Sequence, residues 1–117
     1  MRDLLVHIVN TYINWLDNFG LDGARTFYNN DDVHTIHEIK SIFDNIDLIA
    51  NNFLEKYRND YKSPITKHIA RKGITLTLSP LQLFTHVITH EFHHKGQILT
   101  MSRLLGYTPV DTDVIRT

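Results

Sequence analysis

The sequence has 117 residues, of which 42% are hydrophobic, and this size and composition predict one folded domain over residues 1–117 rather than a disordered chain. Its formal net charge of -1 argues against a general nucleic-acid-binding protein. Because the chain has no cysteine, it excludes disulfides and thiolate ligands, so any metal site must use nitrogen or oxygen ligands. No apolar run is long enough to cross a membrane and no secretory pattern opens the chain, so we expect no membrane partner and a cytoplasmic location.

The first predicted helix runs from Met1 to Phe19. Its apolar residues recur at helical spacing, and Gly20 is expected to end it. His7 lies within this helix, beside the apolar stripe. Because the helical pattern begins at the first residue with no capping residue before it, we expect a segment of the fold to be missing upstream.

A connection over residues 21–30 leads to a second, longer helix, predicted from Asp32 to about Tyr57 by its apolar spacing. Four polar residues at its start are candidate N-caps: Asn29, Asn30, Asp31 and Asp32. Three residues of its first turns, His34, His37 and Glu38, are alternative metal ligands. A solvent-exposed first turn explains these three residues more simply.

Two short segments rich in β-branched residues, at positions 65–69 and 74–78, predict a small hairpin. Ser79 and Pro80 then fit the N-cap and the first position of a third helix. This helix is predicted to run to about Leu105 and to end at the glycine that follows.

The third helix contains the stretch Thr85 to Gly96, THVITHEFHHKG, which holds four of the chain's eight histidines. His90 and His94 are four residues apart, as are His86 and His90, and residues at this spacing lie above each other on one face of a helix. Neutral imidazole is a common ligand of Zn, Ni and similar ions. The spacing therefore predicts that His90 and His94 bind one divalent metal ion, although a single such histidine is more often a partly buried polar residue.

Two histidines leave a metal site incomplete, because catalytic sites usually combine three protein ligands with one open position. His7 is a candidate for the third ligand, since its helix must pack in the same small core. His86 shares a helix face with His90 and His94, but these three would spread along roughly 12 Å of helix axis. His93 lies about 100° around the helix from His94 and cannot easily share its ion. Sequence spacing alone leaves this choice open.

Residues 90–94 also match H-E-x-x-H, the signature of zincin metalloproteases, in which Glu91 would be the general base. The match is short, no third downstream ligand follows, and a domain of this size offers little room for a peptide cleft. A peptidase with Glu91 as its catalytic residue is therefore a less favoured alternative.

The sequence around these histidines forms a longer pattern. Residues 86–97 read HVITHEFHHKGQ, and residues 104–113 read LLGYTPVDTD. Near the start of the chain, residues 5–9 read LVHIV, and Trp15 follows. Together with the hairpin before the last helix, these motifs resemble the DinB-like family of the DinB/YfiT superfamily of metal enzymes, and the resemblance covers most of the chain.

The resemblance implies an all-α fold, a four-helix bundle whose first helix is absent from this chain. It implies a metal site formed by His7, His90 and His94, with Zn or Ni as the most favoured ions. It further implies an enzyme of thiol-transferase or hydrolase type that acts on a small-molecule substrate, such as a low-molecular-weight thiol. A bundle without one wall would leave an apolar groove, so we also expect a homo-oligomer.

Three neutral histidines would leave a bound ion its full positive charge, which lowers the pKa of a bound water towards about 7 or ionises a bound thiol. We expect a hydrogen-bond acceptor behind each imidazole to fix its tautomer, and Asp3, one turn before His7, is a candidate. The alternative from another functional class is a non-catalytic metal-binding or stress-response interaction module. A closed site with four protein ligands would favour that alternative.

Overall fold

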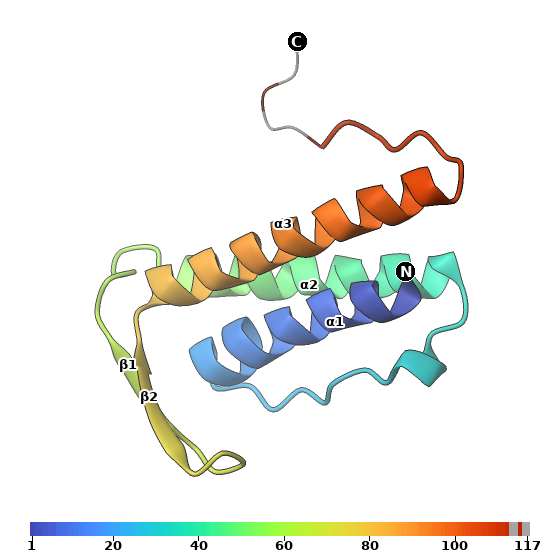
Figure 1. Ribbon diagram of the computed structural model, residues 1–117. Coiled ribbons are helices and arrows are strands. Elements are labelled where there is room, and N and C mark those ends of the chain that lie inside the picture. The colour runs from blue at the N-terminus through green and yellow to red at the C-terminus, as the bar shows by residue number, and fades with distance from the viewer. Residues whose placement is uncertain (113–114, 116–117) are drawn as a thin grey trace.

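The computed structural model describes residues 1–112 and 115, and three main helices form its body (Figure 1). Helix α1 spans Arg2–Tyr12 and continues directly into a π-helical segment, η1, over Ile13–Gly20. A 3-10 turn, η2, covers Asn30–Asp32 and precedes helix α2, Ile36–Lys56. The last helix, α3, spans Pro80–Leu104. Helices α1 and α2 run in the same direction, and α3 runs back in the opposite one (Figure 1).

The first helix is confirmed, but its last turns are wider than an α-helix. The backbone N–H of Leu21 donates to the carbonyl oxygens of both Leu16 and Asp17, each at 3.0 Å, and the first of these bonds has the five-residue step of π geometry. Gly20 lies where a side chain would collide with α2, since a Cβ atom there would be 2.5 Å from the Phe53 ring. A glycine at this position lets the two helices approach closely.

The second helix begins at Ile36, four residues later than predicted. Thr35 is its N-cap, and the Thr35 hydroxyl oxygen accepts a hydrogen bond of 3.1 Å from the backbone N–H of Glu38. The predicted start at Asp32 was wrong because Val33 is buried while its backbone is extended, so this apolar residue belongs to the core without being helical. The predicted caps form or flank the 3-10 turn instead: Asn29, Asn30, Asp31 and Asp32.

The predicted hairpin is confirmed, with β1 at Ile65–Ile69 and β2 at Ile74–Leu78. The strands pair antiparallel from Ile65 opposite Leu78 to Ile69 opposite Ile74, and the hairpin lies at one end of the helices (Figure 1). The start of α3 also follows the prediction. Ser79 and Gln82 form a reciprocal capping box, and Pro80 occupies the first turn.

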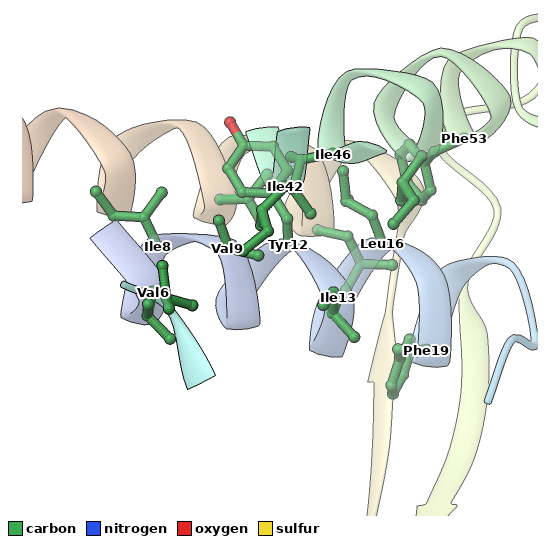
Figure 2. Close-up of a cluster of buried hydrophobic side chains, with 14 residues drawn as sticks. Val6, Ile8, Val9, Tyr12, Ile13, Leu16, Phe19, Ile42, Ile46 and Phe53 are labelled. Carbon is green, nitrogen blue, oxygen red and sulfur yellow. The ribbon is translucent and has the colours of Figure 1, made fainter. Parts of the chain in front are cut away.

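The core lies mainly between α1, η1 and α2, as Figure 2 shows. Its most deeply buried large side chains, each less than 2% exposed, include Ile8, Val9, Ile13, Leu16, Val33, Ile49, Phe53, Leu83 and Val87. Helix α3 contributes buried residues from its first half only. At its other end apolar residues are exposed: Leu104 is 82% exposed, and Leu105, directly after the helix, is 68% exposed. The C-terminal end of α3 therefore carries apolar side chains that no other helix covers among the described residues.

The chain is mostly helical with a small hairpin before its last helix, as predicted. The four-helix bundle that the family resemblance implied stays a prediction. Among the described residues, none of the helices has both the length and the apolar character that a membrane crossing requires. Asp113, the last residue of the C-terminal motif, lies outside the described residues.

Candidate metal centre

Helices α1 and α3 bring three histidines together. The Nε2 atom of His90 lies 3.0 Å from Nε2 of His7 and 3.2 Å from Nε2 of His94. One ligand atom from each ring lies within 4.8 Å of the other two. Across residues 1–112, no other group of three histidine or acidic side chains gathers its ligand atoms in this way. The four-residue step on α3 and the α1–α3 contact thus create one cluster.

The distances in this cluster suit a metal ion better than a network of hydrogen bonds. Two nitrogen ligands of a tetrahedral Zn²⁺, each at about 2.0–2.1 Å, lie roughly 3.3–3.4 Å apart. The two short Nε2 separations, 3.0 and 3.2 Å, are close to that value. A neutral imidazole nitrogen is either a donor or an acceptor, so Nε2 of His90 cannot form a complementary hydrogen bond with both neighbours. The donor set therefore fits a divalent cation.

Gln97 fixes the orientation of His94. The Nδ1 atom of His94 lies 2.6 Å from Oε1 of Gln97, and an amide oxygen can only accept, so Nδ1 carries the proton and donates. The Nε2 atom of His94 then keeps its lone pair towards the cluster. The motif ends at Gln97 but predicts no role for it, although its position three residues after His94 places the two on one helix face.

The predicted acceptor for His7 is not found in the described structure. The carboxylate of Asp3 instead accepts a hydrogen bond of 3.0 Å from Nε of Arg2, its neighbour in the chain. Asp3 is exposed, so it lies in water rather than behind the His7 ring. Although Asp3 lies one turn before His7 in the helix, its carboxylate does not contact the His7 ring through any described hydrogen bond.

His90 is the half-buried centre of the cluster. Its Nδ1 atom is buried and has no hydrogen-bond partner among the described residues. Burial, with a smaller contribution from positive charge on the neighbouring histidines, lowers the pKa of His90 from 6.5 to about 4. These neighbours are His94, His7, His86 and His93. His90 is therefore neutral at physiological pH, which is the form that a metal ligand requires.

Two further histidines of α3 lie beside the cluster without joining it. The His93 ring meets the His94 ring edge-to-face, with 5.0 Å between centroids. The His86 ring stacks on His90 at 6.0 Å and meets Trp15 at 5.5 Å. Both were competitors for the third ligand position, and the structure brings neither into the three-histidine group.

The histidines at the start of α2 also lie outside the cluster. The backbone N–H of His34 bonds to a carboxylate oxygen of Glu38, which is part of the helix start. His37 is exposed on the first turn of α2. The simpler explanation of these residues, a solvated first turn, agrees with their surroundings.

Glu91 links α3 to α1. No described hydrogen bond joins its carboxylate to the nitrogens of the three clustered histidines. The Tyr12 hydroxyl donates a hydrogen bond of 2.6 Å to Oε2 of Glu91, and Nζ of Lys95 lies 3.5 Å from Oε1. Burial raises the pKa of Tyr12, and the bond to the Glu91 carboxylate raises it further. The protonated Tyr12 hydroxyl is thus a permanent donor at physiological pH. The 79 residues between these partners hid the pair from sequence analysis.

Comparison with known proteins relates this chain to one family. The family model described as the DinB family matches residues 1–117. The uncharacterized protein YizA of Bacillus subtilis (strain 168) is 23% identical over 112 residues, which cover 95% of this chain and 68% of YizA. The resemblance that the histidine motifs predicted is thereby confirmed.

Proposed function

The chain belongs to the DinB family, and we propose that it binds one divalent metal ion through His7, His90 and His94 and uses that ion in catalysis. The observation that carries this proposal is the convergence of three Nε2 atoms from two helices, with neighbouring separations of 3.0 and 3.2 Å. We favour Zn or Ni, because imidazole ligands suit both ions.

The arrangement supports an open site rather than a closed one. A divalent ion held there would supply Lewis-acid activation, which lowers the pKa of a water or thiol at a free coordination position. The chain provides three ligands, and no fourth histidine or carboxylate joins them among the described residues. His7 is exposed, so solvent and small molecules reach the cluster from its side. Three protein ligands with one accessible position are typical of catalytic sites.

Thiol transfer and hydrolysis are the reaction classes that we propose. All three ligands are neutral imidazoles, so the protein leaves the positive charge of the site uncompensated and favours a reactant that becomes anionic. A small molecule such as a low-molecular-weight thiol fits an exposed cluster on a chain of this size. We further propose that this chemistry takes place in the cytoplasm, without a membrane or nucleic-acid partner.

Glu91 remains the candidate proton acceptor for the less favoured metallopeptidase reaction. One of its oxygens accepts the Tyr12 hydroxyl and the other lies near the Lys95 ammonium group. A general base must reach the proton that it removes. Glu91 would therefore have to release Tyr12 before it could serve in that role, whereas its present contacts support a role in holding α1 against α3.

The exposed end of α3 favours a second candidate, a metal-binding interaction module that self-associates. Leu104 is 82% exposed and Leu105 is 68% exposed, and apolar side chains gathered on a surface are typical of association sites. Sedimentation velocity tests whether the chain self-associates. A dimer or larger species supports self-association, and a monomer at all concentrations contradicts it without affecting the proposed metal site.

Metal stoichiometry tests the proposed function. Wild type, His94→Ala and His93→Ala are loaded with Zn²⁺, desalted and measured by elemental analysis. We expect about one ion per chain in wild type and in His93→Ala, because the His93 ring lies outside the cluster. His94→Ala should lose most of its zinc, and full occupancy in this variant would contradict the proposal.

A further inference from the structure

An apolar pocket of about 350 Å³ lies beside the histidine cluster. Three elements form it: η1 contributes Trp15, β2 contributes two leucines, and α3 closes the remaining side. The lining residues are Trp15, Leu76, Leu78, Gln82, Leu83 and His86. No lysine, arginine, aspartate or glutamate is among them. Small-molecule sites are typically concave, mostly apolar and of this size or larger.

A single imidazole ring separates this pocket from the cluster. His86 lines the pocket, its ring meets Trp15 at 5.5 Å, and it stacks on His90 at 6.0 Å. His90 in turn contacts the other two histidines of the cluster. A molecule with one group in the pocket therefore needs only to pass the exposed His86 ring to place another group at the histidine nitrogens.

We propose that this pocket binds the nonpolar part of the substrate, a neutral aromatic or branched aliphatic group, while the reacting polar group lies at His7, His90 and His94. This inference rests on the proposed function. A cavity of about 150 Å³ accommodates benzene, so a pocket of this volume accepts a group of roughly one substituted ring or two fused rings. An ionic group would lose hydration there without gaining an opposite charge.

A neighbouring hollow differs from this pocket in the charge of its lining. This hollow of about 160 Å³ shares Trp15 and Leu76 with the pocket, but lysine and arginine side chains line it. These side chains are Lys67, Arg71 and Lys72, and Lys67 already pairs with the Asp22 carboxylate. The pocket beside the histidine cluster is thus uncharged, whereas the neighbouring hollow is cationic.

Trp15 is the only tryptophan of the chain, so its fluorescence reports on this pocket and on the neighbouring hollow that shares it. The probe is 4-bromobenzyl alcohol, whose bromine quenches indole emission on contact, titrated into metal-free protein. We expect saturable quenching with a Kd on the order of 1 mM, as for other ligands with few heavy atoms. Quenching that stays linear in probe concentration would overturn the proposal.

A pair of matched variants locates the bound probe. Leu78→Phe adds bulk inside the pocket, whereas Thr77→Phe adds the same ring on the exposed face of the same strand. Circular dichroism confirms that each variant is folded. We expect Leu78→Phe to weaken probe binding at least fivefold and Thr77→Phe to leave it unchanged. Equal binding by wild type and both variants would place the probe elsewhere and overturn the proposal. If Leu78→Phe does not fold, Leu78→Ala takes its place and should also weaken probe binding, because Leu78 lines this pocket and not the neighbouring hollow.

The link to the cluster is tested with 4-bromobenzyl mercaptan, which carries a thiol in place of the hydroxyl. We expect stoichiometric Zn²⁺ to tighten mercaptan binding at least tenfold and to leave binding of the alcohol nearly unchanged. If wild type binds zinc but the mercaptan gains nothing, the pocket does not serve the metal site and the inference fails. If wild type binds no zinc, the proposed function fails instead, and the alcohol titration still decides whether the pocket binds apolar groups.

Discussion

The two sides of α1 are held in place by different kinds of contact. On one side, apolar residues such as Ile8 and Val9 are 2% and 1% exposed and pack into the core with α2 (Figure 2). On the other side, α1 meets α3 through polar groups, the His7–His90 contact and the hydrogen bond from Tyr12 to Glu91. The difference indicates that the apolar side stabilises the fold without a metal ion, while the polar side positions ligands. Stability and metal affinity should therefore respond to different substitutions.

The largest expected effect is on stability, at the apolar side. Phe53 is 1% exposed and packs against Gly20, so Phe53→Ala should lower the free energy of unfolding by about 3–5 kcal/mol. Phe92, which is 46% exposed on α3, provides the control. Phe92→Ala should change the free energy of unfolding by less than about 0.5 kcal/mol. Urea denaturation of metal-free protein measures both values. Equal losses would show that the apolar side is not the main source of stability.

A smaller effect is expected at the polar side, and on affinity rather than stability. Gln97→Ala removes the acceptor that fixes the His94 tautomer, so zinc affinity should fall by about 10–100-fold. Thr100→Ala is the matched control, because Thr100 lies on the next turn of α3 and its hydroxyl donates to the Gly96 carbonyl oxygen. Competition titration against a zinc chelator measures both. An unchanged affinity in Gln97→Ala would remove this residue from the site.

The smallest expected effect is the pH dependence of the metal-free protein. The pKa of His90 is about 4 when folded and 6.5 in its usual state, so between these values the unfolded chain binds more protons. The stability that neutral His90 contributes is therefore complete above about pH 6.5 and is lost as pH falls towards 4. His90→Leu should flatten this part of the profile. Thermal unfolding at pH 7 and pH 5 checks it, and parallel profiles for the two proteins would contradict the assignment.

Regular structure was predictable from this sequence where periodicity and local chemistry agree. The hairpin and the start of α3 follow from β-branched segments and from Ser79 followed by Pro80. The start of α2 was misplaced because a buried apolar residue, Val33, lies in extended chain just before the helix. Burial is a property of the whole fold, so a local pattern cannot distinguish this residue from the first turn of a helix.

The site divides in the same way between local and long-range information. His90 and His94 were predictable because a four-residue step aligns them on one helix. His7 is 83 residues away from His90, so spacing could not show that these residues meet. The packing of its helix in the same small core made His7 a candidate, and the resemblance to the DinB-like family selected it. The bond from Tyr12 to Glu91 spans 79 residues and had no local signal at all. These contacts depend on how α1 packs against α3, and residue spacing along the sequence does not predict that packing.

The role of His7 is tested most directly by titrating wild type, His7→Ala and His37→Ala with Zn²⁺ at pH 7.5 and pH 6.0. His37→Ala is the control, since His37 is exposed on the first turn of α2 outside the cluster. We predict that His7→Ala binds zinc at least about tenfold more weakly than wild type, and that the loss grows at pH 6.0, where protons compete for the remaining imidazoles. His37→Ala should match wild type at both pH values. Equal zinc affinities for wild type and His7→Ala at both pH values would contradict a three-histidine site that spans α1 and α3.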